Sequence, residues 1–389
     1  MSHFEMVDGV TQDAVIKVMG VGGGGGNAVH HMLAMGIDGV EFICVNTDAQ
    51  ALRHTEARLP LQIGSNLTRG LGAGSNPDIG RQAALEDRER LQEVIRGSDL
   101  LFVTACMGGG TGTGAAPVIA QIAKEMGILV VAVVTKPFAF EGSRRMTIAQ
   151  KGISELAKTV DSLITVPNEK LLSVVGAEIP LLEAFKIANG VLVGAVQGIA
   201  ELITRPGTIN LDFADVRTVM SEMGTAMMGT GRAQGERRAR EAVEQAVASP
   251  LLEECDLSGA KGLLVNVSVG GEPGLSLGEF QEVGDYVRHL ASDDAVVKIG
   301  TVVDPALGGE LRVTVVVTGI NSVRQRGPVA VEVAKEQEPR VVNGPRQPVN
   351  YLDLDPPTVK RKKPQAIPPT LYEEEALSDI PAFLRRQAD

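Results

Sequence analysis

Two clusters of glycine, at residues 20–27 (GVGGGGGN) and 108–114 (GGGTGTG), each follow an apolar run that is typical of a buried strand. Glycine leaves no side chain between the backbone and a ligand, and it adopts positive φ without strain. A Gly-rich turn that opens a helix presents free N–H groups and the positive end of the helix dipole to an anion. Two such loops at one edge of a sheet would hold a polyphosphate from both sides.

The chain from residue 14 to residue 180 alternates short apolar runs with helical patterns, which predicts an α/β fold with a Rossmann-like, mainly parallel sheet. Ligands of open parallel sheets bind outside the carboxyl ends of the strands, so both glycine clusters are expected at one edge. The expected strands are 15–19, 40–45, 100–106, 128–134 and 162–166, and the expected helices are 27–35, 80–96, 115–126 and 143–158.

Residues 181–204 read as one long central helix, about 36 Å at 1.5 Å per residue. Gly190, Gly194 and Gly198 recur at four-residue spacing along it, and we expect them to allow close packing. A membrane-spanning helix is the alternative interpretation. The charged residues within this stretch argue against it and favour a helix wedged between two domains.

A second, smaller α+β domain follows, with expected helices at 213–220, 236–248 and 277–291 and strands at 262–269, 295–303 and 310–318. Ten of the chain's 20 prolines lie between residues 328 and 381, which predicts a disordered linker. The last residues regain a helical pattern whose apolar face would fit a partner's groove, and the alternative is a frayed terminus with chance spacing. The expected divisions are a flexible N-terminus (1–13), a nucleotide-binding domain (14–180), the central helix (181–204), the α+β domain (205–319), the linker (320–375) and a partner-binding tail (376–389).

Composition narrows the class of protein. The formal net charge of −11 gives no general nucleic-acid footprint, so no nucleic-acid partner is expected. Cys44, Cys106 and Cys255 form no CxxC pair, which favours a reduced, cytosolic setting. The N-terminus lacks the basic start and apolar core of a signal peptide.

The first cluster contains the G-x-G-x-x-G pattern of dinucleotide-binding folds, and Asp48 ends the next expected strand. An NAD-dependent oxidoreductase is therefore an alternative, although it has no obvious use for the second cluster and no His-centred hydride-transfer set stands out. A P-loop is excluded because neither Gly-Lys-Ser nor Gly-Lys-Thr occurs. Phosphate charge must then be met by backbone N–H groups, a metal ion and Arg145. His30 and His31 are adjacent and diverge on a helix, so we do not interpret them as a metal site.

The second cluster resembles the signature loop of tubulin. Together with the first cluster and the segments TKPFAFEGSRR, NGVLVGAVQGIAELITRPG, NLDFADV and DIPAFLRRQAD, it makes the chain similar to the FtsZ family, the tubulin-like GTPases of bacterial cell division. The likeness covers residues 10–319 and resumes at the tail. It implies a tubulin/FtsZ-like fold, binding of GTP and GDP at the sheet edge, and head-to-tail polymerisation into the cytoplasmic division ring at mid-cell.

The resemblance also implies the nucleotide contacts. The glycine clusters would surround the phosphates, a loop at 72–74 would lie near the γ-phosphate, and further residues would meet the ribose and the base. Many relatives have Asp where this chain has Gly190, so Asn189 is expected to bear more of the guanine recognition. The implied contacts are Gly23, Gly24, Gly25, Gly26, Asn27, Gly72, Ala73, Gly74, Gly108, Gly109, Gly110, Thr111, Gly112, Thr113, Gly114, Glu141, Arg145, Asn168, Phe185 and Asn189.

The segment NLDFADV has two compatible interpretations. Asp212 and Asp215 fit a helix N-cap and a first-turn acid. The resemblance instead makes Asn210, Asp212 and Asp215 catalytic, placed against the nucleotide of the next subunit with Mg²⁺ nearby, so that hydrolysis requires the filament. A non-hydrolysing filament regulator is a more remote alternative, and the intact pair of acids argues against it.

The tail completes the resemblance. It implies that membrane-tethering and regulatory division proteins bind this segment, so that the membrane is reached only indirectly. The tail residues expected to make this contact are Asp379, Ile380, Pro381, Phe383 and Leu384.

Overall fold

The computed structural model describes residues 14–320 except 177–178, 206, 222–223, 253–259, 272–273, 290 and 293, and it describes no side chains for 172–175. All described residues belong to one compact unit, Met1–Gly327. The expected flexible N-terminus, the tail and all but the first position of the expected linker lie outside the described residues.

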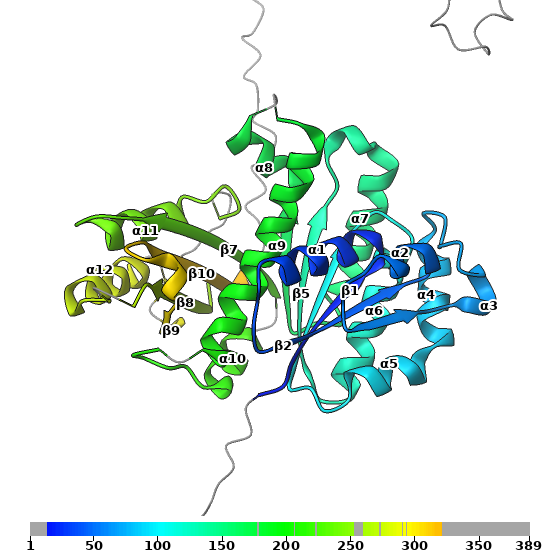
Figure 1. Cartoon of the computed structure of the whole chain (residues 1–389), viewed down its shortest axis with the longest axis horizontal. Coiled ribbons are helices and arrows are strands. Elements are labelled where there is room, and N and C mark those ends of the chain that lie inside the picture. The colour runs from blue at the N-terminus through cyan, green and yellow to red at the C-terminus, as the bar shows by residue number, and fades with distance from the viewer. Residues whose placement is uncertain are drawn as a thin grey trace, which may run out of the picture. The chain divides into compact units, whose positions relative to one another are not determined.

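Ten strands in the described residues form one sheet, in the order β3-β2-β1-β4-β5-β6-β7-β10-β8-β9 (Figure 1). The strands β1 to β6 pair in parallel, β10 runs antiparallel between β7 and β8, and β9 is parallel to β8. The predicted parallel sheet followed by a smaller α+β part is confirmed. The bounds are β1 Ile16–Val21, β2 Val40–Asn46, β3 Leu59–Gln62, β4 Leu100–Cys106, β5 Leu129–Lys136, β6 Ser162–Pro167, β7 Gly224–Ala233, β8 Gly262–Val269, β9 Val296–Val303 and β10 Leu311–Ile320.

Helices cover both faces of this sheet and account for its continuous apolar strands. One core joins α1, α9 and α10 to one face, a second joins α4 to α7 to the other face of the parallel strands, and a third joins α11 and α12 to β8 and β10 (Figure 1). The bounds are α1 Gly22–Ala34, α2 Ala49–Arg53, α3 Ser65–Thr68, α4 Pro77–Glu86, α5 Arg88–Ile95, α6 Thr111–Glu125, α7 Ser143–Leu156, α8 Asn168–Val175, α9 Leu181–Thr204, α10 Phe213–Met220, α11 Arg238–Val247 and α12 Leu277–Arg288.

Two sequence expectations are corrected here. The expected helix 80–96 is two helices, α4 and α5, separated at Asp87, whose carboxylate accepts a hydrogen bond from the Gly64 nitrogen at 2.7 Å. Strand β7 was not predicted because it is rich in glycine. A Cβ on Gly231 would lie 2.0 Å from the Ala242 carbonyl oxygen in α11, so the missing side chains let this helix pack directly on the strand.

The long helix α9 has the predicted bounds and belongs to the core. It is the one helix in the described residues that is long and apolar enough to cross a membrane, but Leu192, Val196 and Ile199 along it are fully buried within the protein. The expected close packing holds at Gly198, where a Cβ would lie 2.8 Å from the Thr314 side chain. At the two preceding glycines of the series an added Cβ would have free space or only distant contact.

Candidate nucleotide-binding site and acidic loop

The two glycine clusters meet at the carboxyl ends of the neighbouring parallel strands β1 and β4. A Cβ on Gly22 would come within 2.9 Å of the Gly112 nitrogen, so the clusters are in contact. Helices α1 and α6 begin at Gly22 and Thr111, earlier than expected, so the glycines form the first helical turns. First-turn N–H groups have no partner within their helix, and both helix dipoles therefore favour an anion at this edge.

Packing rather than ligand approach explains many of the glycines. A Cβ on Gly24 would lie 2.3 Å from the Cys106 sulfur, and one on Gly114 would lie 1.9 Å from the Pro77 carbonyl oxygen. A smaller set has no atom within 4 Å of an added Cβ and is therefore open to a ligand. These open positions are Gly23, Gly26 and Gly109.

A third loop, residues 72–76, packs on the second cluster. A Cβ on Gly110 would lie 2.8 Å from the Ala73 side chain. The Gly72 nitrogen donates to the Thr47 carbonyl at 3.3 Å, and the Thr47 and Thr111 hydroxyl oxygens lie 2.6 Å apart. The sequence analysis did not identify Thr47 as a residue that connects the loop to the cluster.

Charged side chains complete this part of the site. The Arg145 Nη1 lies 3.0 Å from the Glu141 Oε2, and the Glu141 Oε1 accepts a hydrogen bond from the Phe138 nitrogen at 2.8 Å. Arg144 also faces the cavity beside this pair and was not predicted. That cavity has a volume of about 580 Å³ and is lined by Gly74, Ser75, Asn76, Pro77, Gly108, Glu141, Arg144, Arg145 and Ile148.

A second cavity, of about 420 Å³, lies on the first cluster. It brings the open glycines of α1 together with Asn27 and with residues that follow β2. Its lining is Gly22, Gly23, Gly26, Asn27, His30, Cys44, Val45, Asn46, Ala51, Leu52, His54 and Thr55.

The expected nucleoside contacts lie beside α9. Asn168 begins α8 and is buried, and among the described residues its Oδ1 has no hydrogen-bond partner. An unpaired buried amide oxygen costs about 1–3 kcal/mol, which a ligand donor would offset. Phe185 in the first turns of α9 is 39% exposed. Its ring contacts the Phe138 ring edge-on, with 5.5 Å between the two ring centroids. Asn189 lies one turn further along the same helix.

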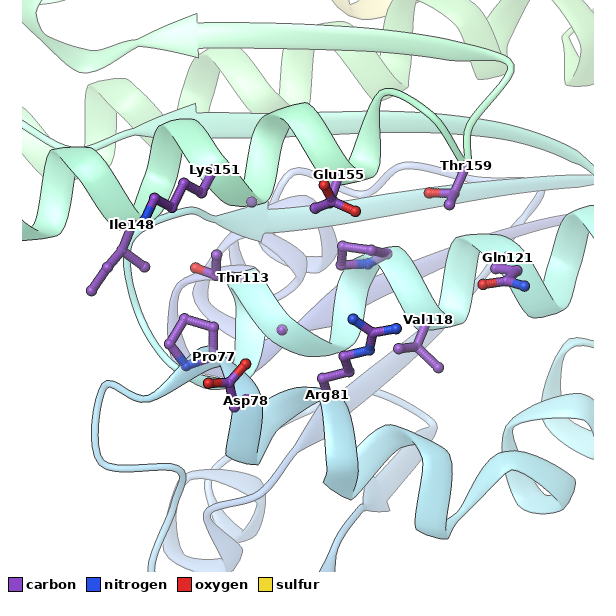
Figure 2. A pocket seen from close by; sticks show the side chains of 13 residues that line it. Pro77, Asp78, Arg81, Thr113, Val118, Gln121, Ile148, Lys151, Glu155 and Thr159 are labelled. Carbon is purple, nitrogen blue, oxygen red and sulfur yellow. The ribbon is translucent and has the colours of Figure 1, made fainter.

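A separate cavity of about 420 Å³ lies between α4, α6 and α7 (Figure 2). Arg81 projects toward it from α4, while Lys151 and Glu155 belong to α7 (Figure 2). It shares Thr113 and Gly114 with the second cluster but none of the residues expected at the ribose or the base. We therefore do not assign it to the nucleotide.

The acidic loop confirms the cap interpretation for both acids, because Asp215 lies in the first turn of α10. Asp212 is the N-cap of α10, and its Oδ1 accepts a hydrogen bond from the Asp215 nitrogen at 2.7 Å. The Asp215 Oδ1 is paired instead with the Lys298 Nζ at 2.6 Å, a contact that the sequence did not indicate. Asn210 accepts a hydrogen bond from the Gly207 nitrogen at 2.7 Å, which folds the loop before the cap.

This acidic loop lies near the amino ends of the parallel strands, whereas the glycine clusters lie at their carboxyl ends. Arg217 in α10 donates to the carbonyl of Gly127, which precedes the amino end of β5. Arg205, just after α9, lies 3.7 Å from Asp38, which precedes the amino end of β2. The predicted catalytic residues and the predicted nucleotide contacts are therefore not brought together within one chain.

Metal-binding capacity is limited in the described residues, which contain no group of three or more His, Cys, Asp or Glu side chains able to hold a metal ion. Asp212 and Asp215 each engage one carboxylate oxygen in the contacts above, and a carboxylate has a second. Such oxygens suit Mg²⁺, which proteins usually bind through one or two carboxylates together with substrate phosphates. The acidic loop thus fits a magnesium ion that is held mainly by the nucleotide.

Comparisons with known proteins show the family of the chain. The family model of the Tubulin/FtsZ family, GTPase domain, matches residues 15–176, and that of the FtsZ family, C-terminal domain, matches residues 224–321. The chain is 58% identical to the cell division protein FtsZ of Pseudomonas aeruginosa, with 99% of this chain and 100% of that protein covered. It is 57% identical to the cell division protein FtsZ of Coxiella burnetii, with 98% and 99% covered.

Solved structures give the same likeness. The empty FtsZ dimer of M. jannaschii matches with a TM-score of 0.76 and 46% identity, covering 79% of this chain and 89% of that one. The GDP-bound monomer of CetZ1 from Haloferax volcanii matches with a TM-score of 0.70 and 20% identity, covering 80% and 96%, and this likeness concerns the fold alone.

Proposed function

The chain belongs to the FtsZ family of tubulin-like cell-division GTPases, and from this premise we propose that each GTP-hydrolysing site is shared between two stacked copies. GTP binding, GTP hydrolysis and self-assembly into filaments follow from the family. Membership disfavours the NAD-dependent oxidoreductase.

One copy supplies the nucleotide pocket. The first turns of α1 and α6 direct N–H groups at the phosphates, and the open glycines let the backbone approach them. Arg145, held by Glu141, adds a positive charge beside the second cluster. The unpaired amide oxygen of Asn168 and the exposed ring of Phe185 favour contact with the nucleoside.

The position of the acidic loop is the observation that carries the proposal. The parallel strand β5 has eight residues, which at 3.3 Å per residue separates its two ends by about 26 Å. Asp215 lies beyond the amino end of these strands and the glycine clusters lie beyond the carboxyl ends. A side chain cannot span that distance, so the carboxylates must reach the nucleotide of another copy.

In the shared site, Asp212 and Asp215 position and polarise the water that attacks the γ-phosphate. The Asp212 Oδ1 holds the first turn of α10 in place, which fixes the loop before a neighbour binds. When bound with GTP, Mg²⁺ neutralises phosphate charge, and the carboxylates of the loop are suitable ligands. Phosphoryl transfer depends on this positioning and charge stabilisation more than on covalent chemistry.

Mixing two inactive variants tests the shared site. Asp215→Ala keeps the nucleotide pocket, and Gly110→Val keeps the acidic loop but crowds the loop at residues 72–76. Each alone should lose turnover, whereas the mixture should regain part of it because one variant supplies GTP and the other supplies Asp215. Glu89→Ala, a first-turn acid of α5, is the matched control and should keep full turnover.

Dilution of the unaltered protein gives the decisive outcome. A shared site requires the GTPase rate per subunit to fall steeply below the polymerisation threshold. A rate that stays constant far below this threshold would falsify the shared site, leaving Asp212 and Asp215 as acids that stabilise α10.

We also propose that the tail binds membrane-tethering and regulatory division proteins through the apolar side chains of residues 380–384, and that the protein acts in the cytoplasm. The spacing of those side chains in the sequence supports the first point. The domain divisions given above, including the boundary after residue 319, are kept as part of this proposal.

A further inference from the structure

We propose that Lys298 is a positioning residue for GTP hydrolysis, because it holds the Asp215 carboxylate in the orientation that the neighbouring subunit's nucleotide requires. This inference rests on the shared site proposed above. Lys298 lies in β9, far along the chain from the acidic loop, and its Nζ is 2.6 Å from the Asp215 Oδ1. A charge-assisted contact of this length restrains the position of the Asp215 Oδ1.

The backbone of the acidic loop is hydrogen-bonded to strand β9. The Thr301 nitrogen donates to the Ile209 carbonyl at 2.9 Å, and the Ile209 nitrogen donates back to the Thr301 hydroxyl at 2.8 Å. Gly300 leaves room for the loop, since a Cβ there would lie 3.0 Å from Leu211. The backbone of the loop is thus fixed to β9 before the catalytic acid.

Lys298 adds a contact from β9 to the side chain of Asp215. Alternate residues of a strand point to the same face, so Lys298 shares the face of Gly300, which packs on the loop. The Asp212 cap sets the start of α10 from the other side. Asp215 is therefore held at its backbone by the cap and at one side-chain oxygen by Lys298, which leaves its Oδ2 for water or a cation in the next subunit.

Folding stability does not explain the pair. The Lys298 and Asp215 side chains are 35% and 31% exposed, and ion pairs between partly exposed groups contribute little to stability. A change at Lys298 should therefore act on turnover far more than on unfolding. This difference separates a positioning role from a structural one.

The test compares Lys298→Met, which keeps an unbranched side chain one heavy atom shorter and removes the charge, with Lys298→Arg, which keeps the charge. For Lys298→Met, kcat should fall about three- to tenfold, since small misplacement of a positioned group costs up to about a hundredfold. The KM for GTP, the polymerisation threshold and the melting temperature should stay unchanged. Lys298→Arg should recover most of the lost kcat.

Lys158→Met is the matched control, because Lys158 forms an ion pair of 2.7 Å with Glu155 on α7, away from the acidic loop. It should leave kcat unchanged. Asp215→Ala is measured in parallel. If Asp215→Ala abolishes turnover while Lys298→Met retains full kcat, the role of Lys298 is refuted and the shared site stands. If Asp215→Ala retains turnover, the shared site fails and this inference fails with it. A fall in kcat that tracks a lower melting temperature would identify Lys298 as structural and also overturn the inference.

Discussion

Replacing Gly110 by alanine separates packing from ligand approach in the second glycine cluster. A Cβ there would lie 2.8 Å from the Ala73 side chain and 2.9 Å from the Asn76 nitrogen. Its φ of −78° suits any residue, so the cost arises from crowding and not from backbone strain. Crowding of this kind costs about 1–3 kcal/mol. Each kcal/mol lowers the melting temperature of a domain of 150–250 residues by about 2–4 °C.

The same crowding should weaken GTP binding. The loop at residues 72–76 must move to admit the methyl group, and it lines the cavity beside Glu141. We expect GTP affinity to fall at least tenfold, equivalent to about 1.4 kcal/mol. Thermal melting without nucleotide and titration with a fluorescent GTP analogue measure the two effects separately.

Gly109→Ala is the matched control within the same loop, because an added Cβ meets no protein atom within 4 Å. Its melting temperature without nucleotide should match that of the unaltered protein, while its GTP affinity should fall if the phosphates approach the backbone there. A Gly110→Ala variant that melts and binds GTP normally would refute the reasoning. So would a Gly109→Ala variant that is the less stable of the two.

Three further outcomes are expected. In α9, Gly194→Ala should raise the free energy of unfolding by about 0.5–1 kcal/mol, because alanine favours the helix more than glycine does and its Cβ has free space. Gly198→Ala should lower the free energy of unfolding, because its Cβ would crowd Thr314. Urea midpoints in the reverse order would contradict both expectations. Burial raises the pKa of the Cys106 thiol above its ordinary value of 9.0, so the folded state holds this proton more tightly and the thiol's contribution to stability is lost as the pH rises beyond that value. The Cys106 side chain is partly exposed, so the raised pKa is what should make iodoacetamide at pH 8 modify it more slowly in the folded protein than in urea, and equal rates would be evidence against that shift. Truncation after Thr370 should leave GTPase activity and sedimentable polymer intact and abolish binding to membrane-tethering division proteins; an unfolded core would show that the tail is structural.

Much of the fold can be predicted from the sequence because buried parallel strands produce continuous apolar runs. The five strands expected before residue 180 are all present, as is α9 with its predicted bounds. Strand β7 escaped detection because Gly229 and Gly231 replace the β-branched residues that mark a strand, and their absence of side chains is what α11 requires. The break at Asp87 depends on a hydrogen bond to a distant loop, which no local pattern reveals.

The candidate site shows the same division between local and distant information. Both glycine clusters meet where the sequence placed them, since strand ends and Gly-rich turns are local signals. Two contacts join residues far apart in the chain and therefore form only after folding. They are the hydroxyl contact between Thr47 and Thr111 and the ion pair between Lys298 and Asp215. The glycines needed for packing and those open to a ligand look alike in sequence.

The glycine clusters lie at the carboxyl ends of the parallel strands and the acidic loop lies near their amino ends. Each subunit therefore has two unlike ends. Stacking through unlike ends gives an open filament unless the rotation closes a ring, and an open filament has one fewer complete junction than it has subunits. In the proposed shared site, the nucleotide exposed at one tip has no neighbouring carboxylates and is expected to stay unhydrolysed until another subunit arrives. Hydrolysis per subunit should therefore rise at most twofold from dimers to long filaments, and a growing tip keeps its own GTP through growth.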